Sequence, residues 1–170
     1  MNKPTKNIIT RGWVAKELEF YNKANIRSNL LILCAIYAFF LPITIILIFA
    51  ILNNINNIFL DIILATFTSF LFFIPFFYQY SILKKYLSEK KLISSQLFEI
   101  SVAELSYKDE RAGRTTEYFL HFPGFDMVSV GHNIYDYASK NDKYYLVHYK
   151  GSNKVRLYYS DIAYEYDENN

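Results

Sequence analysis

The chain has 170 residues, of which 52% are apolar, 20% are charged and 19% are aromatic, and its formal net charge is +2. This composition excludes a collagen-like chain, a disulfide scaffold and an intrinsically disordered protein, because each of these requires a different bias. The charges are distributed unevenly: between Ser28 and Leu83 the only charged residue is Asp61. A stretch of this length with one charge is typical of a membrane protein.

Two apolar runs, residues 30–52 and 58–80, predict two transmembrane helices. At 1.5 Å per residue each run reaches about 34 Å, which is enough to cross a hydrocarbon core of about 30 Å. The Asn-rich segment 53–57 between them is so short that the two helices must form an antiparallel hairpin. The length of residues 1–29 before the first run disfavours a cleaved signal peptide, and two consecutive long runs disfavour a buried soluble helix pair.

Lysine and arginine residues precede the first run and follow the second, whereas the connecting loop has none. The positive-inside rule therefore predicts a multi-pass protein of the cell membrane with both termini in the cytoplasm. We expect residues 1–29 to be an amphipathic basic segment with a helix capped by Thr10, and residues 81–96 to be a juxtamembrane basic helix. Seven basic side chains in these flanks are candidates for contact with lipid headgroups: Lys16, Lys23, Arg27, Lys84, Lys85, Lys90 and Lys91.

Pro42 interrupts the hydrogen-bond ladder of the first helix, because it cannot donate to the carbonyl of residue 38. Antiparallel pairing about the loop brings Pro42 level with Thr68 and Ser69, and we expect one of these hydroxyls to help satisfy that carbonyl. Asp61 lies about one turn from the outer boundary, where it can be an interfacial acid favoured by the helix dipole. The alternative for Asp61 is a proton relay or a carboxylate that pairs with a partner.

Residues 97–170 carry a different pattern and predict a small cytoplasmic β-domain. They contain 8 Lys and Arg and 12 Asp and Glu. An alternation of apolar and polar residues with a period of two begins at Phe98. We expect a first strand with a bulge near residues 103–104, a polar turn at 108–114, strands at 115–122 and 125–130, and an irregular loop with a possible helical turn at 131–142. The overall expectation is a mixed α and β membrane protein whose strands form a barrel-like or rolled antiparallel sheet.

The clearest hairpin pairs residues 143–149 with 155–160 across Lys150-Gly151-Ser152-Asn153. The first of these strands is apolar or aromatic on both faces, which predicts a central position. Residues 162–166 form a last short alternating run before the acidic end of the chain.

The sequence contains no spacing that predicts an enzyme, a metal site or a bound cofactor. The three histidines lie in separate segments, one cysteine cannot form a thiolate site, and no phosphate-binding glycine loop is present. Nucleic-acid binding is disfavoured because the β-domain has net charge −4, whereas phosphate contacts require a positive surface.

The leading hypothesis is a hairpin that tethers a protein-binding β-domain to the membrane, with lipids and either a protein partner or further copies of the chain as partners. The tyrosine-rich β-domain suits protein contacts. One alternative is a membrane-embedded inhibitor or immunity-type protein that acts through its helices. A second alternative is a subunit of an oligomeric pore or transporter.

Overall fold

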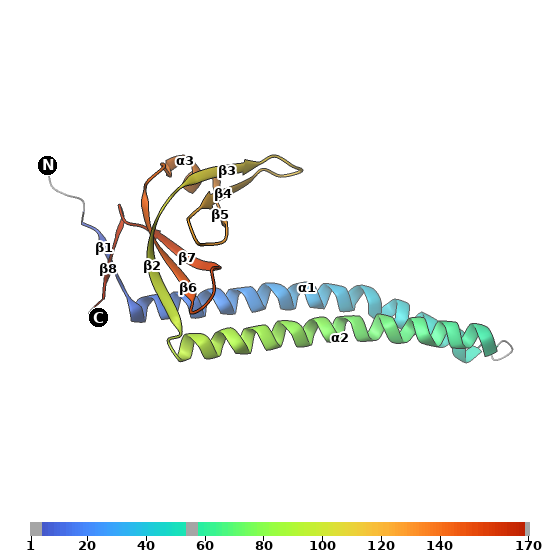
Figure 1. Cartoon of the computed structure of the whole chain (residues 1–170). Helices are drawn as coiled ribbons and strands as arrows, with labels where there is room; N and C mark the ends of the chain where they lie inside the picture. The colour runs from blue at the N-terminus through green and yellow to red at the C-terminus, as the bar shows by residue number, and fades with distance from the viewer. Residues whose placement is uncertain (1–4, 54–57, 169–170) are drawn as a thin grey trace. The chain divides into compact units, whose positions relative to one another are not determined.

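The computed structural model describes residues 5–53 and 58–168, and it combines long helices with small sheets (Figure 1). The chain divides into two compact units. Residues 1–19 and 91–170 form the sheet unit, and residues 20–90 form the helical unit. Residues 5–19, which are part of the expected amphipathic basic segment, and residues 91–96, at the end of the expected juxtamembrane helix, thus belong to the sheet unit.

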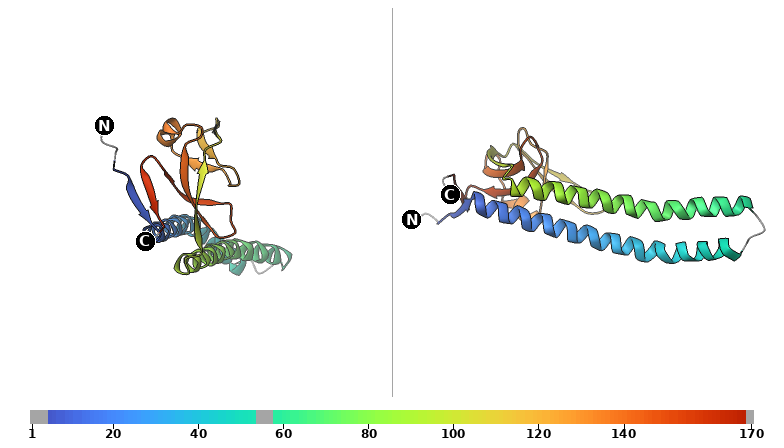
Figure 2. Two further views of the ribbon diagram at one scale, coloured as in Figure 1. Left: turned by 60° about the vertical axis from the view of Figure 1, so that its left-hand side comes forward. Right: turned by 90° about the horizontal axis from the view of Figure 1, so that it is seen from below.

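Both helices run without a break through the predicted spans and their flanks. Helix α1 extends over Arg11–Asn53 and α2 over Ile58–Ser94, and within the helical unit they lie side by side and antiparallel (Figure 2). The Thr10 hydroxyl accepts a hydrogen bond from the Trp13 backbone N–H at 3.2 Å, which confirms the predicted cap. The expected loop residues 54–57 lie outside the described residues.

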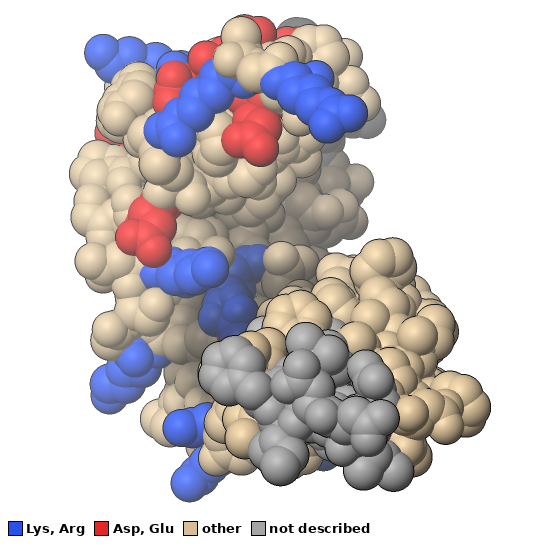
Figure 3. Space-filling view, turned by 90° about the vertical axis from the view of Figure 1, so that its right-hand side faces the viewer, with Lys and Arg blue, Asp and Glu red and all other residues tan. Residues whose placement is uncertain are grey.

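The two helices are long and apolar enough to cross a membrane by length and composition. Only 6% of the most apolar stretch of α1 and 13% of that of α2 are buried within the chain. The described surface at the loop end of the hairpin shows no charged side chain in Figure 3. The helices therefore present apolar side chains around most of their circumference, which is unlike an ordinary surface helix with one apolar stripe.

The strands form three small sheets. Their order is β1–β8 in the first, β2–β6–β7 in the second and β3–β4–β5 in the third. The strand bounds are β1 Asn7–Thr10, β2 Phe98–Glu104, β3 Tyr107–Arg111, β4 Glu117–His121, β5 Val128–Val130, β6 Lys143–Tyr149, β7 Val155–Ser160 and β8 Tyr164–Asp167. A short helix, α3, covers His132–Tyr137 and corresponds to the expected helical turn.

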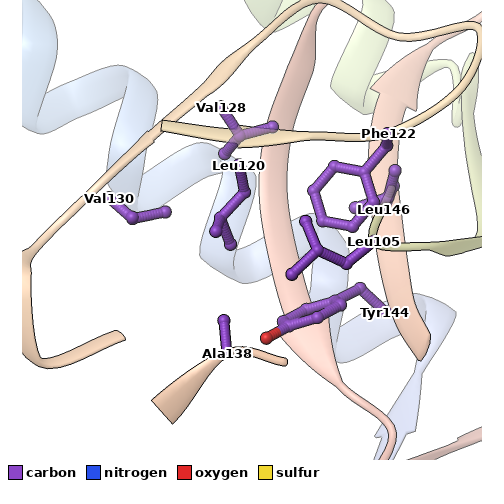
Figure 4. Close-up of a cluster of buried hydrophobic side chains, with 8 residues drawn as sticks. All are labelled: Leu105, Leu120, Phe122, Val128, Val130, Ala138, Tyr144 and Leu146. Atoms are coloured by element: carbon purple, nitrogen blue, oxygen red, sulfur yellow. The ribbon is translucent and has the colours of Figure 1, made fainter. Parts of the chain in front are cut away.

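Strand β6 is central in its sheet, as its two apolar faces predicted. Leu146 on one face belongs to a core cluster with the β3–β4–β5 sheet and the end of α3 (Figure 4). Val147 on the other face belongs to a second cluster with β1, the start of α1 and the end of α2. The predicted hairpin is confirmed at both strands, and Gly151 in its turn has φ +75°, a conformation that favours glycine.

Two strand predictions were wrong. Residues 107–111 form strand β3, although we expected a polar turn there. The strand is polar because it lies at a sheet edge and its long side chains cover aromatic rings, with Lys108 Nζ 4.5 Å from the Tyr135 ring centre and the Arg111 guanidinium 4.8 Å from that of Phe119. The expected bulge near residues 103–104 is also absent from β2, which pairs continuously with β6 up to Glu104.

The alternation of apolar and polar residues shifts after residue 103, and the cause of this shift is not a bulge. The chain leaves the β2–β6–β7 sheet after Glu104 and enters the β3–β4–β5 sheet at Tyr107. Leu105, between the two strands, is fully buried in the first core cluster. The irregularity occurs instead in the pairing of β6 with β7, between Val147 and His148.

Strand β1 has no counterpart among the predicted elements. It pairs in parallel with β8, with Ile9 opposite Tyr166. Ile9 is completely buried in the second cluster, whereas Ile8 is 67% exposed. The N-terminal segment is therefore a structural part of the sheet unit.

Candidate binding groove

A groove with a volume of about 570 Å³ crosses the sheet unit beside strand β7. This volume lies within the range of ligand pockets in proteins. The groove is lined from α3 and the segment after it, from the start of β6, from the end of β7 and from the turn into β8. Its aromatic lining consists of Tyr137, Tyr144, Tyr158, Tyr159 and Tyr164, and its further lining residues include Asp142 and Ile162.

The floor and the rim of the groove differ in exposure. Tyr144 is only 5% exposed, and in Figure 4 its ring lies beside Leu105 while its hydroxyl points to the side of Ala138. Tyr137 and Ile162 at the rim are 87% and 64% exposed. A rigid aromatic floor with an exposed apolar rim is typical of a protein-contact site, since tyrosines supply area with few rotatable bonds.

Strand β7 is an edge strand, because among the described strands only β6 pairs with it. Edge strands leave one row of backbone N–H and C=O groups for an additional strand. An extended peptide in the groove would therefore lie next to backbone groups that can pair with it.

Behind the groove, three aromatic rings form a cluster. The ring centres of Trp13 and Tyr159 are 5.2 Å apart, those of Tyr159 and Tyr164 are 5.2 Å apart, and those of Trp13 and Tyr164 are 6.4 Å apart. The Tyr159 hydroxyl is buried and has no hydrogen-bond partner among the described residues. The start of α1 thus supports the wall of the groove through Trp13.

Among the described residues of the groove lining, Asp142 alone is charged, and its position is fixed by the loop before β6. One carboxylate oxygen accepts a hydrogen bond from the Ser139 backbone N–H at 2.7 Å. The backbone of Asp142 also donates to the Ser139 carbonyl and accepts from the Leu105 N–H. No Lys or Arg occurs among the described residues of the lining.

Three of the groove tyrosines, Tyr144, Tyr158 and Tyr159, are neutral at physiological pH. Burial raises the pKa of Tyr144, Tyr158 and Tyr159 above the ordinary value of 10.0, and for Tyr144 the nearby carboxylate of Asp142 raises it further. The groove therefore carries one negative charge among electron-rich rings, an environment that favours a cationic group.

Each histidine is held by its neighbours. His148 is buried, and its Nε2 lies 3.0 Å from the Ser101 hydroxyl and 4.0 Å from a Glu99 carboxylate oxygen. Its Nδ1 faces the Tyr149 carbonyl at 3.3 Å rather than a carboxylate. His121 stacks on Tyr107 with 3.9 Å between ring centres.

His132 lies 3.3 Å from a carboxylate oxygen of Asp136, one turn further along α3. No group of three or more metal-ligating side chains occurs within residues 5–53 and 58–168. Pairing or stacking thus involves each histidine, but the buried Nε2 of His121 has no hydrogen-bond partner among the described residues and lies 3.9 Å from an Asp109 carboxylate oxygen.

The residues predicted to pack the hairpin occupy different environments. Thr68 is buried, whereas Pro42 and Ser69 are exposed. The Ser69 hydroxyl donates to the Ala65 carbonyl of its own helix at 2.8 Å, so its single proton is used there and not at the carbonyl that Pro42 leaves open. The part played by Thr68 stays a prediction, and the side chain of Asp61 lies outside the described residues.

Sequence reasoning missed Thr44, which is also buried in the helical unit and donates to the Phe40 carbonyl at 2.9 Å. The seven basic side chains predicted to contact headgroups are all exposed: Lys16, Lys23, Arg27, Lys84, Lys85, Lys90 and Lys91.

Neither a protein-family model, nor a curated protein, nor a solved structure matches this chain. The groove itself was not predicted, because its lining comes from four separate segments. The signal in the sequence was the density of tyrosines between residues 135 and 166.

Proposed function

We propose that this chain is an integral membrane protein in which a two-span hairpin holds the sheet unit at the cytoplasmic face, where the tyrosine groove binds a basic, extended segment of a protein partner. The observation that carries the proposal is the lining of the groove, with five tyrosines, one carboxylate and no Lys or Arg among its described residues. Arginine and lysine side chains are attracted both to aromatic faces and to a carboxylate.

The edge strand β7 supports an extended conformation for the partner. Backbone pairing along a sheet edge gives affinity, and the side chains that enter the adjacent pocket give specificity. The exposed rim residues Tyr137 and Ile162 would cover the apolar parts of such a segment.

Insertion into a membrane is supported by the exposed apolar surface of the helical unit, which a bilayer would cover. The distribution of lysine and arginine supports cytoplasmic termini. This orientation would place the groove in the cytoplasm.

The experiment is site-specific photo-crosslinking in native membranes. A benzoylphenylalanine residue at position 137 reports on the groove, and the same residue at position 107 is the matched control, because Tyr107 is also exposed but belongs to the β3–β4–β5 sheet. We expect an adduct at position 137 that is absent at position 107, with the cross-linked stretch of the partner containing Arg or Lys.

The variant Asp142→Asn tests the charge while preserving the fold, because an amide oxygen can still accept the Ser139 hydrogen bond. We expect it to reduce the adduct at position 137 about tenfold, on the scale of one charge-assisted contact. Equal adducts at positions 107 and 137, or an adduct unaffected by Asp142→Asn and lacking basic residues, would contradict the proposal.

A further inference from the structure

A second cavity, of about 210 Å³, lies between the two helices of the helical unit. Its α1 side includes Asn22, Asn25 and Asn29, and its α2 side includes Lys85 and Glu89. In contrast to the tyrosine groove, this interhelical cleft carries amide, ammonium and carboxylate side chains beside its apolar ones.

The polar groups of the cleft are part of the helix packing. Asn22 is 4% exposed and Glu89 is 7% exposed. The Asn22 amide N–H lies 3.4 Å from the Tyr86 carbonyl across the cleft, and the Asn29 amide donates to the Asn25 carbonyl at 2.8 Å. Asparagine is a poor helix former, and burying a carboxylate is costly unless it is paired, so these residues are unusual in a helix pair that packs mainly through apolar side chains.

Along the two helices, the cleft lies where the first apolar run begins and the second one ends. Asn29 immediately precedes the first run, and Tyr78, which also lines the cleft, is near the end of the second. From Asn29 to Asn22 the helix advances about 10 Å, which reaches through the headgroup layer of about 5–8 Å that covers each side of the hydrocarbon core. With the hairpin in a bilayer, the cleft would open among lipid headgroups.

The charges of the cleft match a zwitterion that contains a primary ammonium. Lys85 and Glu89 are the only charged residues in its described lining, and they lie one helical turn apart. The Lys85 ammonium can donate to a phosphate, while Glu89 can accept from an ammonium. Glu89 already has a partner within the chain, but an ionised carboxylate offers about four acceptor positions.

We infer that the interhelical cleft binds the headgroup of an ethanolamine phospholipid, with its phosphate at Lys85 and its ammonium at Glu89. A choline headgroup has no N–H to donate to Glu89, and an anionic glycerol headgroup lacks the positive charge. The inference goes beyond the proposed protein-binding groove and shares with it only the insertion of the hairpin into a bilayer.

The test is native mass spectrometry of the full chain, purified in mild detergent with equimolar phosphatidylethanolamine, phosphatidylcholine and phosphatidylglycerol. We expect the wild type to retain phosphatidylethanolamine about tenfold more than the other two, on the scale of a hydrogen bond to a charged group. Equal retention of the three lipids would overturn the inference.

Three variants assign the contacts. Lys85→Ala should lose the retained lipid, and Glu89→Gln should retain phospholipid without distinguishing ethanolamine from choline. Lys84→Ala removes the same charge one residue outside the cleft and should keep the ethanolamine preference. Identical effects of Lys84→Ala and Lys85→Ala would indicate general surface attraction and contradict the site.

Excess soluble phosphoethanolamine distinguishes a lipid from a free metabolite. Even in excess it should not displace the lipid, because it lacks the acyl chains that would lie along the apolar helices; displacement would contradict a lipid ligand. The cross-link at position 137 serves as the independent readout of the groove. If the cross-link at position 137 persists in Lys85→Ala while the wild type retains all three lipids equally, the headgroup site is refuted and the protein-binding groove is not.

Discussion

The Tyr159 hydroxyl is a destabilising feature of the sheet unit, because it is buried and has no hydrogen-bond partner among the described residues. Replacing Tyr159 by Phe keeps the ring against Trp13 and removes the unpaired group. We expect the free energy of unfolding to rise by about 1 kcal/mol, measured by thermal denaturation of the detergent-solubilised chain with near-UV circular dichroism. Tyr107→Phe, at a residue that is 56% exposed, is the control and should change the free energy of unfolding little; a loss of stability in Tyr159→Phe would show that the Tyr159 hydroxyl has a partner.

The raised tyrosine pKa values predict alkaline sensitivity of the same unit. Burial raises the pKa of Tyr144, Tyr158 and Tyr159 in the folded state above the value of 10.0 for an exposed tyrosine. The neutral form is thus favoured by folding, so this contribution to stability is fully present below pH 10 and is lost as the pH rises through the folded-state values.

Denaturation midpoints measured from neutral pH to well above pH 10 should therefore fall at the alkaline end, together with tyrosinate absorbance. The decline should be shallower in Tyr159→Phe, which removes the most strongly shifted of the three groups. A midpoint that stays constant throughout this range would contradict the assignment.

At the scale of elements, strand β1 is predicted to be essential to the sheet unit although it lies at the start of the chain. Ile9 belongs to this strand, and its side chain is completely buried in the second core cluster. Ile9→Ala should lower the free energy of unfolding by about 2–5 kcal/mol, the usual cost of a buried cavity. The neighbouring Ile8→Ala, at a 67% exposed side chain, should cost below about 0.5 kcal/mol; equal effects of the two variants would show that β1 does not pack as described.

The elements that the sequence predicted well are those specified by local patterns. The two helices follow from long apolar runs, and the β6–β7 hairpin follows from alternation on both sides of a glycine turn. Strand β3 was missed because its polar side chains are stabilised by aromatic rings from other segments. The parallel pairing of β1 with β8 was missed because it joins the two ends of the chain, and no local signal specifies such a contact.

The candidate site was less predictable than the fold for the same reason. The lysines predicted to contact headgroups could be chosen from charge alone, but only the three-dimensional structure distinguishes Lys85, which lines the interhelical cleft, from Lys84. Likewise, the tyrosines were visible in the sequence, whereas their convergence with Asp142 beside an edge strand depends on the arrangement of α3, β6, β7 and the turn into β8.

At the scale of the whole molecule, we propose that the sheet unit recognises a partner and that the hairpin holds the sheet unit at the membrane. This can be separated from the alternative of an inhibitor that acts through its helices by replacing residues 30–80 with an unrelated two-span hairpin of the same topology. The replacement leaves both segments of the sheet unit, residues 1–19 and 91–170, unchanged.

We expect the chimera to retain the partner adduct at position 137, because tethering mainly raises the effective concentration of the groove near its partner. Expression, insertion and the cytoplasmic location of both termini are verified first, with an impermeant maleimide and single cysteines in a Cys34→Ser background. An inhibitor that binds its target through Thr68 and the phenylalanine-rich second helix would instead lose its partner in the chimera, even with the sheet unit folded. Loss of the adduct in a correctly inserted chimera would therefore transfer the recognition function from the groove to the helices.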